Sequence, residues 1–284
     1  MAQAAGLALV PRARRDPGRA TTQGVGRLIA DALHRGCRSI AVTLGGSATV
    51  DGGAGMAQDL GARLTDRAGR PVPPGGAGLL KLAAIDARPV NRLMRGVRVV
   101  GLTDVRNPLL GPQGASRVFG PQKGATPAQV RMLERGLARF AMVCRRDLGI
   151  NVTRIPGAGA AGGLGAGLSA FLGAKLESGA DWIFRRLDLD SRLENADLVL
   201  TGEGSLDEQT RMGKLVARVA ARARRYHVPV IAFAGQVTLP PRGIARLGLA
   251  AAYGLSGNGV TERESFRRAA AILERRAFEA LRKF

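Results

Sequence analysis

Residues 196–234 read ADLVLTGEGSLDEQTRMGKLVARVAARARRYHVPVIAFA and hold two apolar runs on either side of a helical segment. The runs 196–201 and 228–234 are rich in Val, Leu and Ile, which is typical of buried strands. Helical spacing covers 214–226, and we expect 202–204 (GEG) to form a turn after the first strand. A strand, a helix and a strand in this order make a βαβ unit, which requires a parallel sheet and a right-handed crossover. The sequence therefore predicts an α/β fold.

The rest of the chain also alternates between predicted strands and predicted helices. Apolar runs at 39–44 (SIAVTL) and 97–103 (VRVVGLT) predict two more strands, and 26–33 has helical spacing. Thr126-Pro127 predicts the start of a helix of about four turns, with threonine as the cap and proline in the first turn. Thr261 and Glu264 predict a capping box for a final helix. We expect one buried stripe on that helix, made of Phe266, Ala270, Leu273, Ala277 and Leu281.

Composition excludes several classes of protein. The apolar share of 45% is too high for a disordered chain, and the 40 glycines among 284 residues follow no collagen repeat. Two cysteines cannot form a disulfide framework, which favours a reducing compartment. The uncharged run 155–174 is dominated by glycine and alanine and contains Pro156, so we do not expect it to cross a membrane. The sequence therefore predicts a cytoplasmic protein that does not bind membranes.

Three polar clusters follow predicted strands. Because ligands of parallel α/β sheets bind beyond the carboxyl ends of the strands, these clusters are the candidate site. Each cluster combines glycine turns, whose N–H groups can converge on an anion, with at least one carboxylate. The clusters are 45–53 (GGSATVDGG), 104–108 (DVRNP) with 119–124 (FGPQKG), and 202–207 (GEGSLD) with Lys214 downstream.

Carboxylates, glycine turns and two isolated lysines suit phosphoryl transfer. That reaction needs Mg²⁺ on carboxylate oxygens, cations near the phosphates and a base for the acceptor hydroxyl. The plainer alternative is that the glycines only make tight turns and the carboxylates only cap helices. Any single cluster leaves the two interpretations evenly matched, because short motifs often occur by chance, whereas three together favour the functional one.

Other motifs give weaker signals. Gly157, Gly159 and Gly162 match the dinucleotide-binding spacing, with Asp181 near the expected acidic offset. Pro156 stands where that motif requires a clean buried strand, so a glycine-rich turn into a closely packed helix is the preferred interpretation. The sequence contains no phosphate-binding loop of the GxxxxGK[ST] type and no GxSxG nucleophile elbow, and its scattered histidines and cysteines do not form a zinc pattern.

Several of these segments together resemble the bacterial glycerate kinase family of the two-domain type. The resembling stretches are TTQGVGRLI (21–29), GGSATVDGGAGMAQDLGARL (45–64), DVRNPLLGPQGASRVFGPQKGAT (104–126), PGAGAAGGLGAGLSAFLGAKL (156–176) and ADLVLTGEGSLDEQT (196–210). The resemblance implies ATP-dependent, Mg²⁺-dependent phosphorylation of D-glycerate, with 2-phosphoglycerate the favoured product. It also implies two α/β domains with a cleft between them, one of them Rossmann-like. We place a central α/β domain at 1–190 and the Rossmann-like domain at 191–284.

Candidate site residues are placed around that expected cleft. Asp207 is predicted to be the general base on the glycerate hydroxyl, and Asp104 and Glu203 are predicted to hold Mg²⁺ and to act in catalysis. Lys123 is predicted to hold phosphate or the substrate carboxylate. The remaining residues predicted to bind substrate or phosphate are Gly45, Gly46, Ser47, Thr49, Asp51, Gly202 and Gly204.

The chain also departs from the family pattern. Val50 replaces an asparagine, Arg106 replaces an acidic residue, and Gln23 replaces an aromatic residue. The first residues resemble an interior segment of the family, so we expect the chain to lack the family's opening and the Rossmann-like domain to be incomplete at its N-terminal part. Such a truncated relative could lack activity.

The charge suggests a competing class. Lys and Arg number 43 against 22 Asp and Glu, giving a net charge of +21 and a pI near 11.6. A non-catalytic relative acting through a basic anion-binding or nucleic-acid-binding surface is therefore the alternative. Only 4% of residues are aromatic, which leaves few platforms for stacking bases, so no specific nucleic-acid partner is expected.

Overall fold

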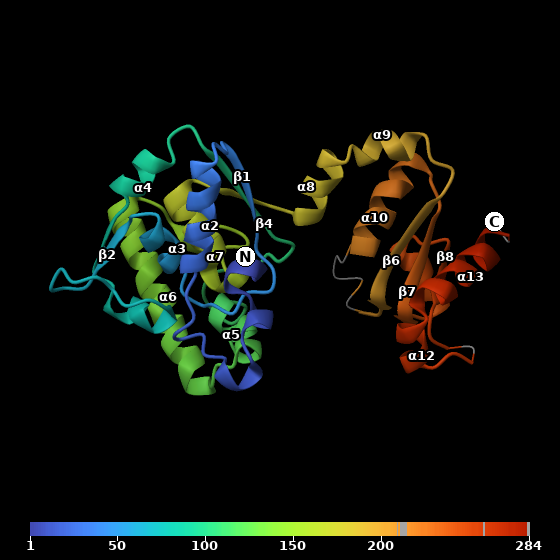
Figure 1. Cartoon of the computed structure of the whole chain (residues 1–284), viewed down its shortest axis with the longest axis horizontal. Helices are drawn as coiled ribbons and strands as arrows, with labels where there is room; N and C mark the ends of the chain where they lie inside the picture. Colours follow the sequence, from blue (N-terminus) through green and yellow to red (C-terminus); the bar gives the residue numbers. More distant parts are fainter. Residues whose placement is uncertain (209, 211–214, 258, 283–284) are drawn as a thin grey trace. The chain divides into compact units, whose positions relative to one another are not determined.

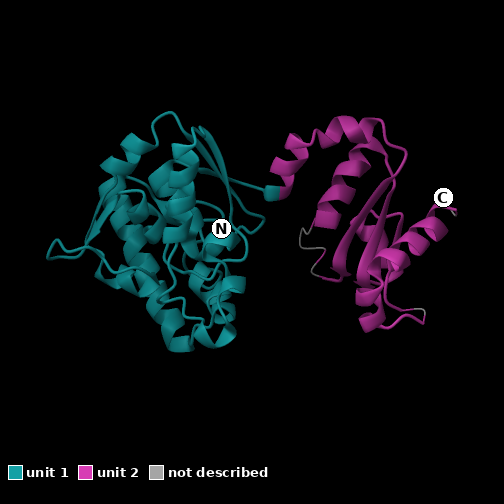
Figure 2. Ribbon diagram, viewed as in Figure 1, with its two compact units in different colours: residues 1–179 teal, residues 180–284 magenta. Residues whose placement is uncertain are grey.

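The computed structural model describes residues 1–284 except 209, 211–214, 258 and 283–284 (Figure 1). The chain divides into two compact units, unit 1 (residues 1–179) and unit 2 (residues 180–284), shown in Figure 2. The boundary placed between residues 190 and 191 from sequence lies inside helix α9, Leu189–Glu194. Each unit has its own parallel sheet, which confirms the predicted α/β class.

Unit 1 is built on a three-stranded parallel sheet with the order β1-β4-β5. The first two strands, β1 (Ser39–Thr43) and β4 (Arg98–Leu102), are those predicted from the apolar runs. The third, β5 (Lys175–Glu177), was not predicted because three residues with a charge at each end carry no strand periodicity. A two-stranded antiparallel hairpin, β2 (Arg63–Thr65) and β3 (Ala84–Asp86), accompanies the sheet.

The long helix α6 (Pro127–Leu148) begins where the sequence predicted. Thr126 and Gln129 form a reciprocal capping box, and Pro127 occupies the first turn. At 22 residues the helix is longer than the four turns expected, because its apolar face, with Leu137 and Phe140 fully buried, continues along the core. The other helices of unit 1 are α1 (Ala2–Ala5), α2 (Gln23–His34), α3 (Ala54–Asp59), α4 (Arg88–Leu93), α5 (Ala115–Phe119) and α7 (Ala160–Leu172).

Helix α7 is the glycine-rich segment that matched the dinucleotide pattern. All thirteen of its residues are buried, and its start is kinked at positive φ from Ala161 to Gly163. The preferred interpretation, a closely packed helix, is confirmed: a Cβ at Gly162 would lie 1.9 Å from the carbonyl oxygen of Thr49, and one at Gly167 would lie 2.8 Å from the Cα of Gly53. No helix in the described ranges is both long and apolar enough to span a membrane.

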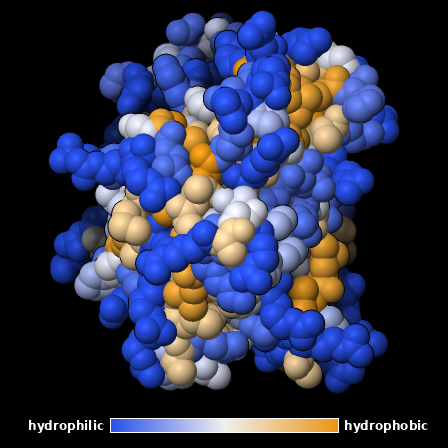
Figure 3. All heavy atoms as spheres, turned by 90° about the vertical axis from the view of Figure 1, so that its left-hand side faces the viewer, coloured by the Kyte–Doolittle hydropathy of each residue, from blue (hydrophilic) through white to orange (hydrophobic). Residues whose placement is uncertain are grey.

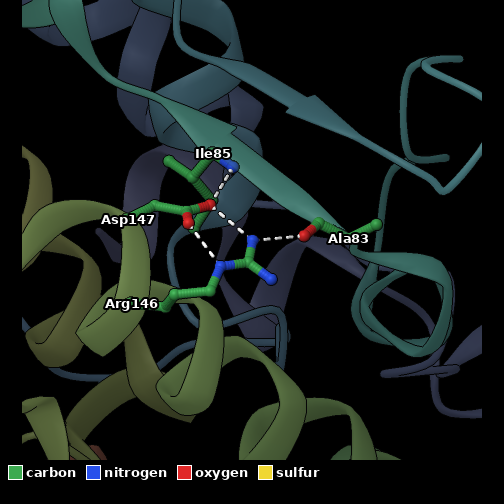
Figure 4. A network of polar contacts seen from close by, with 4 residues as sticks. All are labelled: Ala83, Ile85, Arg146 and Asp147. Atoms are coloured by element: carbon green, nitrogen blue, oxygen red, sulfur yellow. Dashed lines mark hydrogen bonds and ion pairs between the residues drawn. The ribbon is translucent and has the colours of Figure 1, made fainter.

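The end of α6 is tied to the β2–β3 hairpin by a polar network (Figure 4). The Asp147 carboxylate accepts a hydrogen bond of 2.8 Å from the backbone N–H of Ile85 and two more from the Arg146 guanidinium. Arg146 also donates to the carbonyl oxygen of Ala83 at 2.5 Å. The hydrogen bonds from Arg146 and from Ile85 hold the pKa of Asp147 below its ordinary value. One carboxylate thus fixes a hairpin that is 62 residues away in sequence.

Unit 2 is built on a second parallel sheet with the order β6-β7-β8, formed by β6 (Val199–Leu206), β7 (Val230–Val237) and β8 (Ala251–Gly254). The turn predicted at 202–204 is wrong, because Gly202 pairs with Phe233 and Glu203 with Ala234 inside the sheet. Gly202 lets the strands approach each other, because a Cβ there would lie 2.6 Å from the carbonyl oxygen of Phe233. The first strand therefore ends at Leu206, directly before Asp207.

The helices of unit 2 include α8 (Gly179–Arg186), which begins at the boundary residue, and a C-terminal segment that is broken in two. Arg268 has φ −120° and ψ 27°, so the predicted single helix becomes α12 (Glu262–Arg267) and α13 (Ala269–Leu281). The predicted buried stripe is wrong: four of its five members lie on α13, where Leu273 and Leu281 are exposed. Phe266 is 79% exposed, and the buried residues of α13 are Ile272 and Ala280. The remaining helices are α10 (Leu215–Ala223) and α11 (Pro241–Leu247).

The surface of unit 1 that faces the viewer in Figure 3 is mainly hydrophilic, with apolar residues in small separate patches. The ion pairs of the described residues lie largely at such exposed positions. Arg27 with Asp59 and Arg35 with Asp31 are examples in which the arginine side chain is at least 74% exposed. Pairs of this kind contribute roughly 0–1 kcal/mol each, so the core rather than the charge stabilises the fold.

We expect Asp147→Ala to destabilise unit 1 by about 1–3 kcal/mol, because it leaves the buried N–H of Ile85 without its acceptor. Urea unfolding followed by far-UV circular dichroism measures this change. Asp31→Ala is the matched control, since it removes only an exposed pair with Arg35 and should cost less than about 0.5 kcal/mol. Equal effects of the two substitutions would contradict the role given to Asp147.

Candidate active site

The carboxyl edge of the unit 1 sheet brings together residues that follow all three strands. Gly45 and Gly46 follow β1, Asp104 follows β4 and Ser178 follows β5. The Ser178 hydroxyl donates to a carboxylate oxygen of Asp104 at 3.1 Å. Parallel sheets bind ligands at this edge, as the sequence analysis assumed. Ser178 was missed because its strand was missed.

The glycine turn after β1 is exposed. Gly46 has φ +68°, a conformation that favours glycine, and a Cβ at Gly45 would meet nothing within 4 Å. The N-terminal residues hold the turn from one side: Leu7 N–H donates to the carbonyl oxygen of Gly46 at 2.7 Å, and Ala48 N–H donates to that of Ala5 at 2.9 Å. The backbone at Gly45 is therefore open to a ligand.

Lys123 is buried next to this turn. It ends the 3₁₀ turn η4 (Pro121–Lys123), and its side chain reaches back across the unit to the segment after β1. Its Nζ donates to Ser47 Oγ at 2.6 Å and to the carbonyl oxygen of Thr49 at 2.7 Å. Burial lowers the pKa of Lys123 to about 7, although the nearby Asp51 charge acts in the opposite direction. Two of the three ammonium donors are thus used within the protein.

Asp51 is fully buried and receives hydrogen bonds at both carboxylate oxygens. Its donors are the N–H and hydroxyl of Thr22, at 2.8 and 2.9 Å, and the N–H groups of Gly53 and Gly55, at 3.2 and 3.3 Å. Burial raises the pKa of Asp51 and outweighs these hydrogen bonds, which lower it. The observed contacts give Asp51 the task of fixing the start of α3, and its contact with substrate stays a prediction.

Thr22 completes this cluster and was not predicted. Its hydroxyl donates to Asp51 and accepts from the backbone N–H of Met56 at 2.9 Å, so one side chain joins α2 to α3. Thr49 is also buried, and its Oγ1 has no hydrogen-bond partner in the described part of the chain. A buried threonine hydroxyl carries no sequence signal of its own, because its partners are set by tertiary contacts.

The departures from the family pattern have distinct consequences. Val50 is fully buried in the hydrophobic core, where an apolar side chain is well accommodated. Arg106 is exposed, and its carbonyl oxygen accepts from Gly157 N–H at 3.3 Å. Its backbone thus supports the start of the glycine-rich segment while its side chain stays in solvent.

In unit 2, one threonine contacts both Glu203 and Asp207. Thr210 is fully buried, and its Oγ1 donates to Glu203 Oε1 at 2.9 Å. Its N–H donates to Asp207 Oδ1 at 3.2 Å, while Asp207 N–H donates back to Thr210 Oγ1 at 3.2 Å. Glu203, near the end of β6, and Asp207, just beyond it, are therefore held at the carboxyl edge of the sheet. Thr210 is another residue that the sequence analysis missed.

The predicted residues form two groups. Ser47, Thr49, Asp51 and Lys123 gather in unit 1 near Gly45 and Gly46, and Glu203 and Asp207 gather in unit 2. Asp104 belongs to unit 1, so a Mg²⁺ site shared with Glu203, like the expected cleft, stays a prediction. Among the described residues, no three His, Cys, Asp or Glu side chains lie close enough to hold a metal ion by themselves. Lys214 lies outside the described residues.

These features define an α/β protein whose parallel sheets carry glycine turns and carboxylates at their carboxyl edges, the usual ligand-binding edge in this class. A sequence model of the glycerate kinase family matches residues 1–284. The chain therefore belongs to the glycerate kinase family, which confirms the resemblance. The expected lack of the family's opening segment stays a prediction.

Curated relatives and a solved structure agree with the family. The chain is 45% identical to a glycerate kinase of Halalkalibacterium halodurans over 98% of this chain and 73% of that protein. It is 44% identical to a glycerate 2-kinase of Escherichia coli, over 94% of this chain and 70% of that protein. A crystal structure described as glycerate kinase 2 from Salmonella typhimurium LT2 superposes with a TM-score of 0.78 at 43% identity, covering 96% and 74% of the two chains.

The buried Lys123 predicts a pH dependence of stability. Because its pKa is lowered to about 7 in the folded protein, the unfolded chain holds one more proton between about pH 7 and the ordinary lysine value of 10.5. The free energy of unfolding should therefore rise with pH in this window, with a slope of up to about 1.4 kcal/mol per pH unit. Urea unfolding of unit 1 between pH 7 and 10, followed by circular dichroism, measures the slope.

Lys123→Met should remove this rise, and Lys81→Met should retain it because Lys81 is exposed at the end of η3 (Gly76–Lys81). Trp182, the only tryptophan, lies in α8 of unit 2, so its fluorescence reports that unit separately. If the free energy of unfolding changed with pH by the same slope in the unmodified chain and in both variants, Lys123 would keep its proton when buried.

Proposed function

We propose that this chain transfers the γ-phosphoryl group of ATP to a hydroxyl of D-glycerate, with 2-phosphoglycerate as the product. The observation that carries the proposal is the Glu203–Thr210–Asp207 arrangement at the carboxyl edge of β6, in a chain of the glycerate kinase family. Phosphoryl transfer depends on positioning and charge stabilisation rather than on covalent chemistry by the protein. Fixed carboxylates at a ligand-binding edge meet that requirement.

Asp207 is the proposed general base. The glycerate hydroxyl oxygen attacks the γ-phosphorus, the bond from that phosphorus to the bridging β,γ oxygen breaks, and ADP leaves. The hydroxyl proton passes to an Asp207 carboxylate oxygen. Thr210 orients this carboxylate by donating its N–H to Oδ1, so the side chain is held in place before substrate binds.

Mg²⁺ is the proposed metal. The ion commonly takes only one or two protein carboxylates and fills its remaining positions with water and phosphate oxygens. Glu203, held by the Thr210 hydroxyl, is therefore a sufficient first ligand, and Asp104 is the second candidate. When bound, Mg²⁺ would neutralise charge that develops on the transferring phosphoryl group.

Unit 1 supplies the proposed anion-binding residues. The exposed backbone at Gly45 and Gly46 offers N–H groups to phosphate or to the glycerate carboxylate, and the Lys123 ammonium keeps one donor unused by Ser47 and Thr49. Gly202 and Gly204, predicted as phosphate binders, lie within β6. The proposed contribution of Gly202 is to let β6 lie close to β7, which sets the position of Glu203.

We expect Asp207→Asn to lower kcat by about 100-fold or more, because asparagine can still accept from Thr210 N–H but cannot take the proton. ADP release from ATP, Mg²⁺ and D-glycerate measures the rate, and ³¹P NMR separates 2-phosphoglycerate from 3-phosphoglycerate. Asp197→Asn is the control: it is an exposed carboxylate before the amino end of β6 and should leave kcat within about two-fold.

Three results would each contradict a different part of the proposal. Absence of ADP release from the unmodified chain would rule out the proposed kinase activity. Full activity of the Asp207→Asn protein would rule out only the role of Asp207 as the general base. Formation of 3-phosphoglycerate would retain the reaction and correct the acceptor hydroxyl.

A further inference from the structure

Three arginines from two helices line one hollow in unit 1. Arg117 comes from α5, and Arg131 and Arg135 come from α6; together with Ala128 and Glu134 they surround a pocket of about 480 Å³. We call these three residues the arginine triad. None of the predicted site residues lines this pocket, so it is separate from the candidate active site.

The single carboxylate in the pocket is already engaged. Glu134 accepts from the backbone N–H of Gly111 at 2.7 Å and also from the hydroxyl of Ser116, so its oxygens hold the loop that precedes α5. None of the three arginines has an ion-pair partner among the described residues. The pocket therefore carries an excess of positive charge that the protein does not neutralise itself.

The spacing of Arg131 and Arg135 on α6 brings two of these positive charges close together. Arg131 and Arg135 are four residues apart, which places them on one face of the helix where like charges repel. Arg117 lines the same pocket from a separate helix. An anion bound between the three would relieve the repulsion and receive planar, bidentate donors.

We propose that the arginine triad binds a small oligophosphate, a chain of two or three phosphate groups, at a second site outside the active site. Three guanidinium groups around a hollow of this size match several phosphate oxygens rather than a single monovalent anion. No aromatic side chain lines the pocket, so a base has nothing to stack on there. The chemistry therefore favours the phosphate chain as the recognised group.

The sequence alone did not indicate this site. Arg117 stands alone between Ser116 and Val118, and Arg131 is fourteen positions further along the chain. The basic runs of the sequence lie elsewhere. Only the packing of α5 against α6 brings the three guanidinium groups to one pocket.

The test is calorimetric titration of the full chain with tripolyphosphate at about 50 mM salt. We expect the double substitution Arg131→Gln/Arg135→Gln to lower the affinity of one tripolyphosphate-binding step by about ten-fold or more. The matched control is Arg242→Gln/Arg246→Gln on α11, which removes the same charge from two exposed arginines that are also four residues apart. Those two arginines do not line the triad pocket, so the control should change the affinity of this step by less than about two-fold.

Further titrations identify which chemical group the arginine triad binds. Tripolyphosphate and ATP should both show the step that the triad substitution removes, because both contain the phosphate chain, and raising the salt to about 200 mM should weaken it. Equal loss in the triad and control proteins, or no loss in either, would overturn the proposal. A step seen only with ATP, or a DNA duplex that binds the triad more tightly than tripolyphosphate, would also overturn it. The result does not depend on kinase activity.

Discussion

The contact of α7 with the segment 49–53 is the constraint on which much of unit 1 depends. The missing side chains at Gly162 and Gly167 let the helix backbone touch the carbonyl oxygen of Thr49 and the turn at Gly53, and any Cβ there would overlap those atoms. This contact fixes the loop after β1. The same loop supplies both acceptors of Lys123, Ser47 Oγ and the carbonyl oxygen of Thr49. A backbone packing requirement thus determines where a buried amine lies.

The predictable parts of the fold are those with strong local signals. The apolar runs of β1 and β4 and the Thr126-Pro127 start of α6 specify their elements because local propensity and burial agree. The wrong turn at 202–204 shows the opposite case. Glycine, a turn former in isolation, serves there inside a strand because a neighbouring carbonyl oxygen lies where its Cβ would be. Sequence spacing contains no information about that neighbour.

The candidate site was predictable in composition but not in geometry. Strand-end reasoning selected Lys123, Ser47 and Asp51, and these residues do gather, yet their burial and the hydrogen bond between Lys123 and Ser47 come from packing. The hydroxyls that organise the carboxylates, Thr22 and Thr210, were missed because threonine is common and each acts through a partner tens of residues away or through a local turn. The arginine triad was missed for the same reason: its members come from different elements.

The burial of Lys123 has a consequence for how charge is distributed in the proposed reaction. Burial lowers the pKa of Lys123 to about 7, so near neutral pH it supplies less positive charge to an anionic substrate than an exposed lysine would. Its firm contribution is a donor in a fixed position beside the glycine turn. In the proposed reaction, neutralising the triphosphate would then fall to the proposed Mg²⁺ ion and to the backbone N–H groups of the turn. The net charge of +21 acts at longer range, by attracting anions to the surface, and that attraction is sensitive to salt.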